Sequence, residues 1–315
     1  MSAGLSSAAA AQETAADDPA DVDDGITVQG ERKLERSEVI SALRDIAMRG
    51  RTIDTPLSKY QEPICVQIAG LGDDVGTVVA NRIQANVIDA GFTVAPSGCT
   101  TNALVVFVDD PQTFITRLRK KYPDIFTVRG NRRIKAAFRR NDPAINWALF
   151  QLRDRDGANG AQGGAAAGGS FIFGTGNANA LVTNSLDPSR ITIKFSDARI
   201  NSFVIYDAKR ISGYTTNQLA DYATVWLLGN PQPEVEIEVE SAQSILSMFK
   251  TVPEEAPPAM TQLDRAYLRG LYAMGPNEPS IRLERFVRLA YDELDQTDCG
   301  EACATPVAAA EQEAP

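Results

Sequence analysis

The stretch ICVQIAGL at residues 64–71 and the stretch NALVVFVDD at residues 102–110 decide the expected fold. Both are short apolar runs, which are typical of strands covered on both faces of a sheet. Between them, apolar residues repeat at helical spacing from Asp73 to Ala90, and Gly91 is expected to end that helix. The order strand, helix, strand predicts an α/β (α+β) fold in which helices flank a mixed β-sheet.

The same patterns predict further elements on both sides of this unit. Helices are expected at 37–50, from Pro111 through Leu118, and at 216–228, 263–275 and 279–294. Strands are expected at 147–156, 171–173, 179–183, 191–195 and 200–207. The Gly-rich segment 157–170 predicts a mobile loop, and it is not a phosphate cradle because no Gly-Lys-Ser/Thr sequence ends it.

The acidity of the chain is confined to its two ends. The 315 residues carry a formal net charge of −10, yet residues 1–31 hold seven acids without a base, and residues 292–315 hold seven more. Without these fourteen charges, residues 32–291 carry +4. Both ends are rich in Ala and poor in aromatic residues. We therefore predict one globular domain at 32–291 between disordered acidic tails, the first of which is alternatively a signal-peptide remnant.

A basic segment lies inside the expected domain. Residues 117–140 contain ten bases against one acid, Asp124. Such a segment fits an anionic surface or an acidic partner, whereas nucleic acid is not expected since no ladder of base-stacking aromatic residues accompanies it. A solvated helix face and a docking place for the acidic tails are the alternatives. The candidate binding residues in this segment are Arg132, Arg133, Arg139 and Arg140.

The four cysteines bear on the compartment. Cys65 and Cys99 precede the two buried strands, which a connecting helix would bring together, so a disulfide between them is expected. Cys299 and Cys303 would close a short second loop; buried free thiols are the alternative, and a zinc site fits poorly without C-x-x-C spacing. Paired cysteines and the Ala-rich start favour a periplasmic or secreted protein, whereas free thiols would indicate the cytoplasm. No apolar run is long enough for a transmembrane span.

Histidine is absent from the sequence. Its absence removes the histidine-dependent catalytic triads and the imidazole ligands of metal sites. We therefore expect a non-enzymatic binding or assembly protein without a cofactor or metal, whose partner is an envelope protein or a peptide. The alternative is a hydrolase that uses a Ser-Lys pair or paired carboxylates, such as Asp197 and Asp207 on neighbouring strands.

The turn SILSM at 244–248 and the segment MTQLDRAYLRGLYA at 260–273 carry a resemblance. Residues 200–275 resemble the active-site half of metzincin-like zinc peptidases. In that family an edge strand leads to a helix bearing HExxHxxGxxH, then to a Met-containing turn and a helix that begins L-T-x-x-D and closes L-Y. Thr261 and Asp264 match the start of that closing helix.

The zinc motif itself is missing from this chain. With Gly229 matched to the motif glycine, Tyr222, Ala223 and Trp226 stand where the family has His, Glu and His. These side chains neither hold zinc nor activate water, so the resemblance implies a zincin-like fold without catalysis. The cleft that it implies, near Tyr222 and Trp226, would bind an extended peptide by strand addition. An ordinary amphipathic helix with both rings in the core is the alternative.

The pattern PICVQIAGL, a helix to DAGF, then SGCTTNALVVFVDD and TRLRKKYPDIF carries a second resemblance. It is similar to a group of secreted, uncharacterised proteins from alphaproteobacteria. In that group the two cysteines equivalent to Cys65 and Cys99 are expected to pair. The group has no assigned activity, so this resemblance implies only a fold and a compartment.

Overall fold

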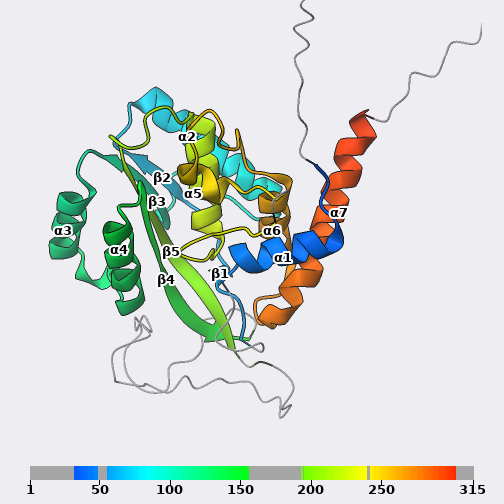
Figure 1. Ribbon diagram of the computed structural model, residues 1–315. Helices are drawn as coiled ribbons and strands as arrows, with labels where there is room; N and C mark the ends of the chain where they lie inside the picture. The colour runs from blue at the N-terminus through cyan, green and yellow to red at the C-terminus, as the bar shows by residue number, and fades with distance from the viewer. Residues whose placement is uncertain (1–31, 49–54, 156–192, 194, 240–241, 303–315) are drawn as a thin grey trace, which may run out of the picture. The chain divides into compact units, whose positions relative to one another are not determined.

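The computed structural model describes residues 32–48, 55–155, 193, 195–239 and 242–302, and side chains only as far as residue 296 (Figure 1). The predictions for 1–31, for the Gly-rich segment 157–170 and for the strands at 171–173 and 179–183 lie outside the described residues. So do the predictions for the side chains of Cys299 and Cys303.

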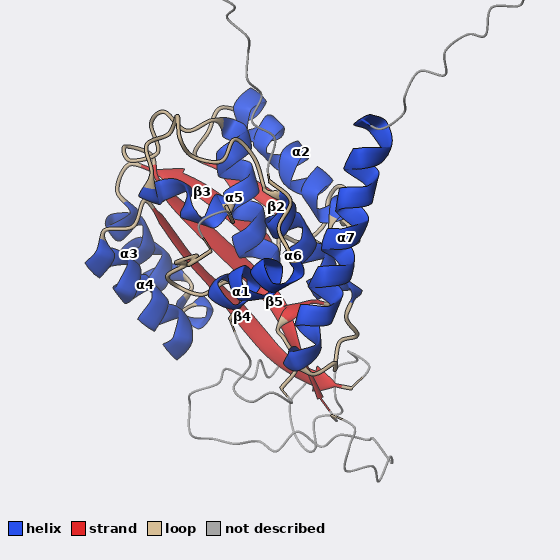
Figure 2. Ribbon diagram, turned by 45° about the vertical axis from the view of Figure 1, so that its right-hand side comes forward, coloured by secondary structure: helices blue, strands red, loops and turns tan. Residues whose placement is uncertain are grey.

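One mixed sheet forms the centre of the molecule, which confirms the expected α/β class (Figures 1 and 2). Its strands are β1 (Lys59–Tyr60), β2 (Val66–Ala69), β3 (Ala103–Val108), β4 (Ala144–Asp154) and β5 (Phe195–Asp207). On one side of β5, β1 pairs with its first part and β3 with its second part, both parallel, and β2 lies outside β3. On the other side, β4 pairs with β5 in antiparallel orientation and forms the edge.

A bulge in β5 decides which of its side chains share a face. Leu149 pairs with Asn201, but the next residue of β4, Phe150, pairs with Arg199, so Ile200 has no partner on β4. The extra residue puts Arg199 on the same face as Ser202, to which it donates a hydrogen bond of 3.1 Å. The sequence predicted two separate strands, 191–195 and 200–207; the structure has one strand from 195 to 207.

Helices cover both faces of the sheet (Figure 2). One hydrophobic core contains residues of α1 (Arg36–Ile46), α2 (Asp73–Asp89), α5 (Thr216–Leu228), α6 (Gln262–Ala273) and α7 (Leu283–Ala302). A second core lies beneath α3 (Pro111–Lys121) and α4 (Val128–Arg140). Short 3-10 helices occupy 123–125, 245–250 and 280–282.

Two helices differ from expectation. The helix α4 was not predicted, because only Gly130, Ile134 and Ala137 are buried on it and two of these are small. The helix α7 continues to Ala302, eight residues beyond the expected end at 294 and into the segment that was assigned to the acidic tail. Acidic residues and alanine are compatible with a helix, so their abundance after residue 291 did not mark a boundary.

The disulfide between Cys65 and Cys99 is present, with the two Cα atoms 6.0 Å apart, as predicted from the strand–helix–strand order. Asn102 fixes the same corner, since its side chain accepts from the Cys65 amide and donates to the Pro63 carbonyl. A disulfide of this kind is typical of an oxidising, exported compartment. Among the described residues, none of the helices is long and apolar enough to span a membrane.

Candidate binding site beneath the end of helix α5

Helix α5 is almost entirely buried, and it occupies the residues that the sequence predicted. The side chain of Thr215 caps its start, and Gln218 completes a capping box. Every residue from Gln218 to Leu228 is buried, so the helix runs through the core rather than along the surface. Its C-terminal end lies over the antiparallel pair β4 and β5 (Figure 1).

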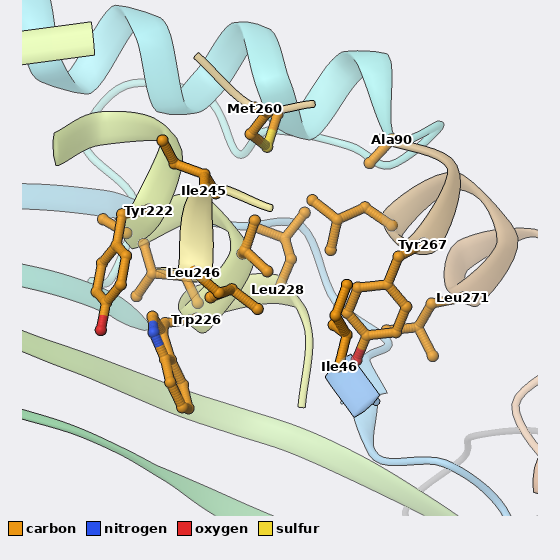
Figure 3. Close-up of a cluster of buried hydrophobic side chains, with 14 of the residues drawn as sticks. Ile46, Ala90, Tyr222, Trp226, Leu228, Ile245, Leu246, Met260, Tyr267 and Leu271 are labelled. Carbon is orange, nitrogen blue, oxygen red and sulfur yellow. The ribbon is translucent and has the colours of Figure 1, made fainter. Parts of the chain in front are cut away.

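Figure 3 shows Tyr222 and Trp226, the two aromatic candidates on α5, side by side at the core. Their ring centroids are 6.2 Å apart, and each side chain is 6% exposed. Tyr222 packs edge-on against Phe249, with centroids 4.9 Å apart, inside the first core. Burial raises the pKa of Tyr222 well above its usual value. Tyr222 is therefore a core residue, whereas Trp226 lies at the border between the core and a group of arginines.

Three arginines gather around Trp226 and Phe150. The guanidinium carbon of Arg133 lies 5.1 Å from the centre of the Trp226 ring, and those of Arg129 and Arg199 lie 5.0 and 5.4 Å from the Phe150 ring. These are cation–π distances. We call Arg129, Arg133 and Arg199 the arginine cluster; two of them come from α4 and the third from β5.

Arg199 is held by the end of α5. Its guanidinium donates to the carbonyls of Trp226 and Leu227, both at 3.0 Å, and to the carbonyl of Gly229. The last carbonyls of a helix lack partners within it and carry partial negative charge, so this contact stabilises both the helix end and the cation. Arg199 is only 4% exposed, and this burial lowers its pKa.

Arg133 connects α4 to the sheet edge and to the segment that follows α5. It donates to the side-chain oxygen of Asn146 on β4 at 3.3 Å and to the carbonyl of Pro231 at 2.8 Å. Burial lowers the pKa of Arg133 to about 9, and the neighbouring positive charges of Arg129 and Arg199 add to this effect. Arg129, in contrast, has an exposed side chain and opens the cluster to solvent.

The arginine cluster has more positive than negative charge. Within the described residues, none of its three members forms an ion pair, and the carboxyl group that interacts electrostatically with Arg129 and Arg199 is that of Asp197. One oxygen of Asp197 accepts from the Ser58 hydroxyl, and its other oxygen, Oδ1, is buried without a hydrogen bond. Burial raises the pKa of this carboxyl group.

Two buried donors of the site also lack an acceptor. The Nε of Arg199 and the indole Nε1 of Trp226 are buried without a hydrogen-bond partner. Buried polar groups without partners are uncommon in folded proteins, and they are costly unless another group satisfies them. Excess positive charge and unsatisfied donors around two aromatic rings suit a ligand that brings an anionic acceptor.

The four arginines that the sequence singled out divide into two pairs. Arg133 belongs to the arginine cluster, and Arg140 forms ion pairs with Asp142 at 2.6 Å and Glu234 at 2.9 Å. Arg132 and Arg139 point away from the sheet and are exposed. The four candidate arginines therefore lie on different sides of α4 and do not form a single group.

The carboxylate pair expected for a hydrolase does not form. Asp197 and Asp207 were expected on neighbouring strands, but both lie on β5, near its opposite ends.

Lys59 is a buried lysine on β1. It donates to the carbonyls of Leu271 and Met274 at the end of α6, and burial lowers its pKa to about 8. Within the described residues, there is no group of three or more Cys, Asp or Glu side chains that could hold a metal ion.

The turn and the helix that carry the zinc-peptidase resemblance do meet in space. Asp264 accepts hydrogen bonds from the Ser244 hydroxyl at 2.5 Å, from the Ile245 amide at 2.8 Å and from the amide and hydroxyl of Thr261, both at 3.0 Å. Its carboxyl group is fully buried, which raises its pKa to about 6. Asp264 therefore ties the turn to α6, and capping is a sufficient physical reason for its position.

Comparisons with models of protein families, with curated proteins and with solved structures gave no match.

Of the site residues, sequence reasoning identified Trp226 and Arg133 but missed Arg129, Arg199 and Phe150. Arg129 was one of ten bases in its segment, and its spacing of four residues from Arg133 was the available indication that both share a helix face. Arg199 and Phe150 meet only because β4 pairs with β5 across a bulge. No local sequence pattern predicts the pairing of β4 with β5.

Proposed function

We propose that this chain is an exported, non-enzymatic binding protein that holds a carboxylate of an acidic peptide in the arginine cluster. The observation that carries the proposal is the excess of guanidinium groups around Trp226 and Phe150, together with the unsatisfied donors of Arg199 and Trp226. The disulfide between Cys65 and Cys99 supports a location in an oxidising compartment, such as the periplasm.

The chemistry of the cluster favours a carboxylate. A guanidinium group presents paired N–H donors whose spacing matches the two oxygens of a carboxylate, and the aromatic rings exclude water from one side. Arg199 is held in place by the end of α5, so it contributes a donor whose orientation is already fixed. Arg129 is exposed and would meet the ligand first. Arg133 lies between α4 and the segment after α5, to which it is bonded through the Pro231 carbonyl.

The edge strand β4 supports a peptide rather than a small free anion. Among the described residues, β4 has a strand partner on one side only, namely β5. An extended peptide that added to the outer edge of β4 would run past Asn146 and Phe150, which contact Arg133 and Arg129. The strand that leads into α5 is the central strand β5 and not an edge strand, so the zinc-peptidase resemblance does not add to this argument.

The first test is a fluorescence titration. The chain has two tryptophans, and Trp147 lies in the second core, so a Trp147→Phe variant leaves Trp226 as the sole indole reporter. We expect a Glu-rich peptide to change its emission saturably and a Gln-rich peptide of the same length to have little effect. The removal of one charged donor, in Arg129→Gln or Arg133→Gln, is expected to weaken binding by about 10-fold or more.

Matched controls come from the same helix. Arg132→Gln and Arg139→Gln remove the same charge from α4 but point away from the cluster, so binding of the Glu-rich peptide should stay within about 2-fold of wild type. Equal weakening by all four substitutions would mean that only overall charge attracts the peptide. Equal binding of the Gln-rich peptide would exclude carboxylate recognition. Either result would overturn the proposal.

A further inference from the structure

A second charged surface of the protein lies on the side of α4 that faces away from the sheet. Val128, Arg132, Lys135 and Arg139 recur at helical spacing along this side, and all four side chains are exposed. The buried residues of α4 are Gly130, Ile134 and Ala137, on the opposite side of the helix. Within the described residues, this stripe is therefore exposed on the surface.

Helix α3 extends the same surface. It lies beside α4 over one face of the sheet (Figures 1 and 2), and Arg117, Lys120 and Lys121 on it are exposed. Tyr122 follows directly, with 47% of its side chain exposed and the Lys121 ammonium 5.1 Å from its ring. We call the six bases of this surface the outer basic face: Arg117, Lys120, Lys121, Arg132, Lys135 and Arg139.

The two helices that form the outer basic face carry no acid, and Asp124, in the 3-10 helix between them, is the one acid of residues 117–140. Neither α3 nor α4 includes an Asp or Glu. In the part of the chain that the structure describes, none of the six bases forms an ion pair. Arg119 shows the contrast, because it turns toward Asn131 at 2.9 Å and lies over the Phe126 ring. Charge left unpaired in this way is available to an external anionic surface.

We propose that the outer basic face docks the protein on a bilayer of anionic phospholipids. Two features favour lipid over nucleic acid. The bases stand on the exposed sides of two helices rather than in a groove, and the apolar side chains of Val128 and Tyr122 are exposed among them, at 42% and 47%. Basic residues around a few apolar side chains fit the headgroup region, where charge attracts and the apolar groups insert.

Docking in this way leaves the arginine cluster accessible. Residue 129 lies about 100° around the helix from residue 128, so Arg129 and Arg133 point to the flank that faces α5 and not to the membrane. The same helix thus serves two surfaces. The proposal does not depend on the peptide site, because no member of the outer basic face belongs to the arginine cluster.

The test is sedimentation of the full chain with vesicles across a salt series. We expect binding to vesicles of phosphatidylglycerol mixed with phosphatidylcholine, loss of that binding as salt rises, and no binding to phosphatidylcholine alone. The double variant Arg132→Gln/Arg139→Gln should weaken binding by about 30-fold, since each base near an anionic surface contributes about a factor of five to ten. Val128→Ser should weaken it by about 3-fold at unchanged charge.

A control removes the same charge elsewhere. Arg36→Gln/Arg285→Gln changes two exposed arginines on α1 and α7, and vesicle binding should stay within about 2-fold of wild type. Equal loss in both double variants would reduce the effect to net charge and overturn the proposal. Absence of binding at low salt, equal binding to phosphatidylcholine, or tighter binding to a DNA duplex at the same salt would also overturn it. Circular dichroism of each variant establishes that it is folded.

Discussion

The two faces of the sheet deal with charge in opposite ways. On the α5 face, charges are buried: Asp221 accepts from Arg82, Asn86 and the Met260 amide, and Asp264 accepts from four donors. On the α3–α4 face, stacked rings fill the core and the bases stay in water. Asp221 and Asp264 are thus buried with their hydrogen bonds complete, whereas Asp197 Oδ1 and Arg199 Nε are buried without a hydrogen bond. The charges that we expect to be available to partners are the incompletely paired arginine cluster and the bases that stay in water.

The largest effect is expected from Asp264→Ala. The substitution leaves the amides of Ile245 and Thr261 and the Ser244 hydroxyl without this acceptor inside the core, and it removes the link between the turn at 244–248 and α6. We expect the free energy of unfolding to fall by about 4 kcal/mol, measured by urea denaturation. The control Asp124→Ala removes an exposed carboxylate near α4 and should change it by less than about 0.5 kcal/mol. Similar losses in both variants would contradict the comparison.

A smaller loss, of about 3 kcal/mol, is expected from Arg199→Met. Methionine fills much of the volume but leaves the carbonyls of Trp226 and Gly229 at the end of α5 without the donor that Arg199 supplies, and the Leu227 carbonyl keeps only the Ser202 hydroxyl. The same change at an exposed base, Arg139→Met, should alter stability by less than about 0.5 kcal/mol. If Arg199→Met proved as stable as wild type, burial of this arginine would serve ligand binding alone and not the fold.

The raised pKa of Asp264 predicts a pH dependence of stability. Its folded pKa of about 6 lies above the unfolded value near 4, so between these values the folded state binds more protons. The contribution of this carboxyl group is fully present below about pH 4 and is lost as the pH rises through about 6. Its full extent is about 3 kcal/mol. Asp264→Asn cannot titrate and should lack this component, which urea denaturation from pH 4 to pH 7 would measure for both proteins. Parallel profiles would contradict the assignment.

Two parts of the fold could be predicted from the sequence because their strands and helices have clear apolar patterns and clear end signals. The unit from residue 64 to residue 108 combines continuous apolar strands with a helix that Gly91 follows, and the disulfide follows from that order. Helix α5 was predicted to the residue, because Gly229, Asn230 and Pro231 follow its end, and the structure adds the Thr215 cap at its start. In these segments the local preferences and the tertiary structure agree.

The rest depended on contacts between distant residues. The first half of β5 contains Asp197 and Arg199, which argue against a buried strand until the end of α5 and the Ser58 hydroxyl supply their partners. The helix α4 lacks a clear apolar period because Gly130, which packs against Trp147, and the small Ala137 occupy buried positions where larger residues usually mark a core face. The candidate site could not be predicted for both reasons, since it contains residues of α4 and of the first half of β5.

The smallest expected effect compares two neighbouring arginines on α4. Arg133→Gln loses a cation that lies over Trp226 and donates to Asn146 and Pro231, so we expect stability to fall by about 1 kcal/mol. Arg132→Gln loses an exposed charge and should change stability by less than about 0.5 kcal/mol. Thermal unfolding of the two variants side by side measures the difference.

The sign of that difference is informative because burial lowers the pKa of Arg133 to about 9, which shows that its charge is held at a cost. If Arg133→Gln is more stable than wild type, the fold maintains this arginine against its own stability, as expected for a group kept for a ligand. If it is less stable, the arginine also ties α4 to the segment after α5. If Arg132→Gln and Arg133→Gln are equally stable, the two arginines have equivalent environments. The distinction between the arginine cluster and the outer basic face would then be contradicted.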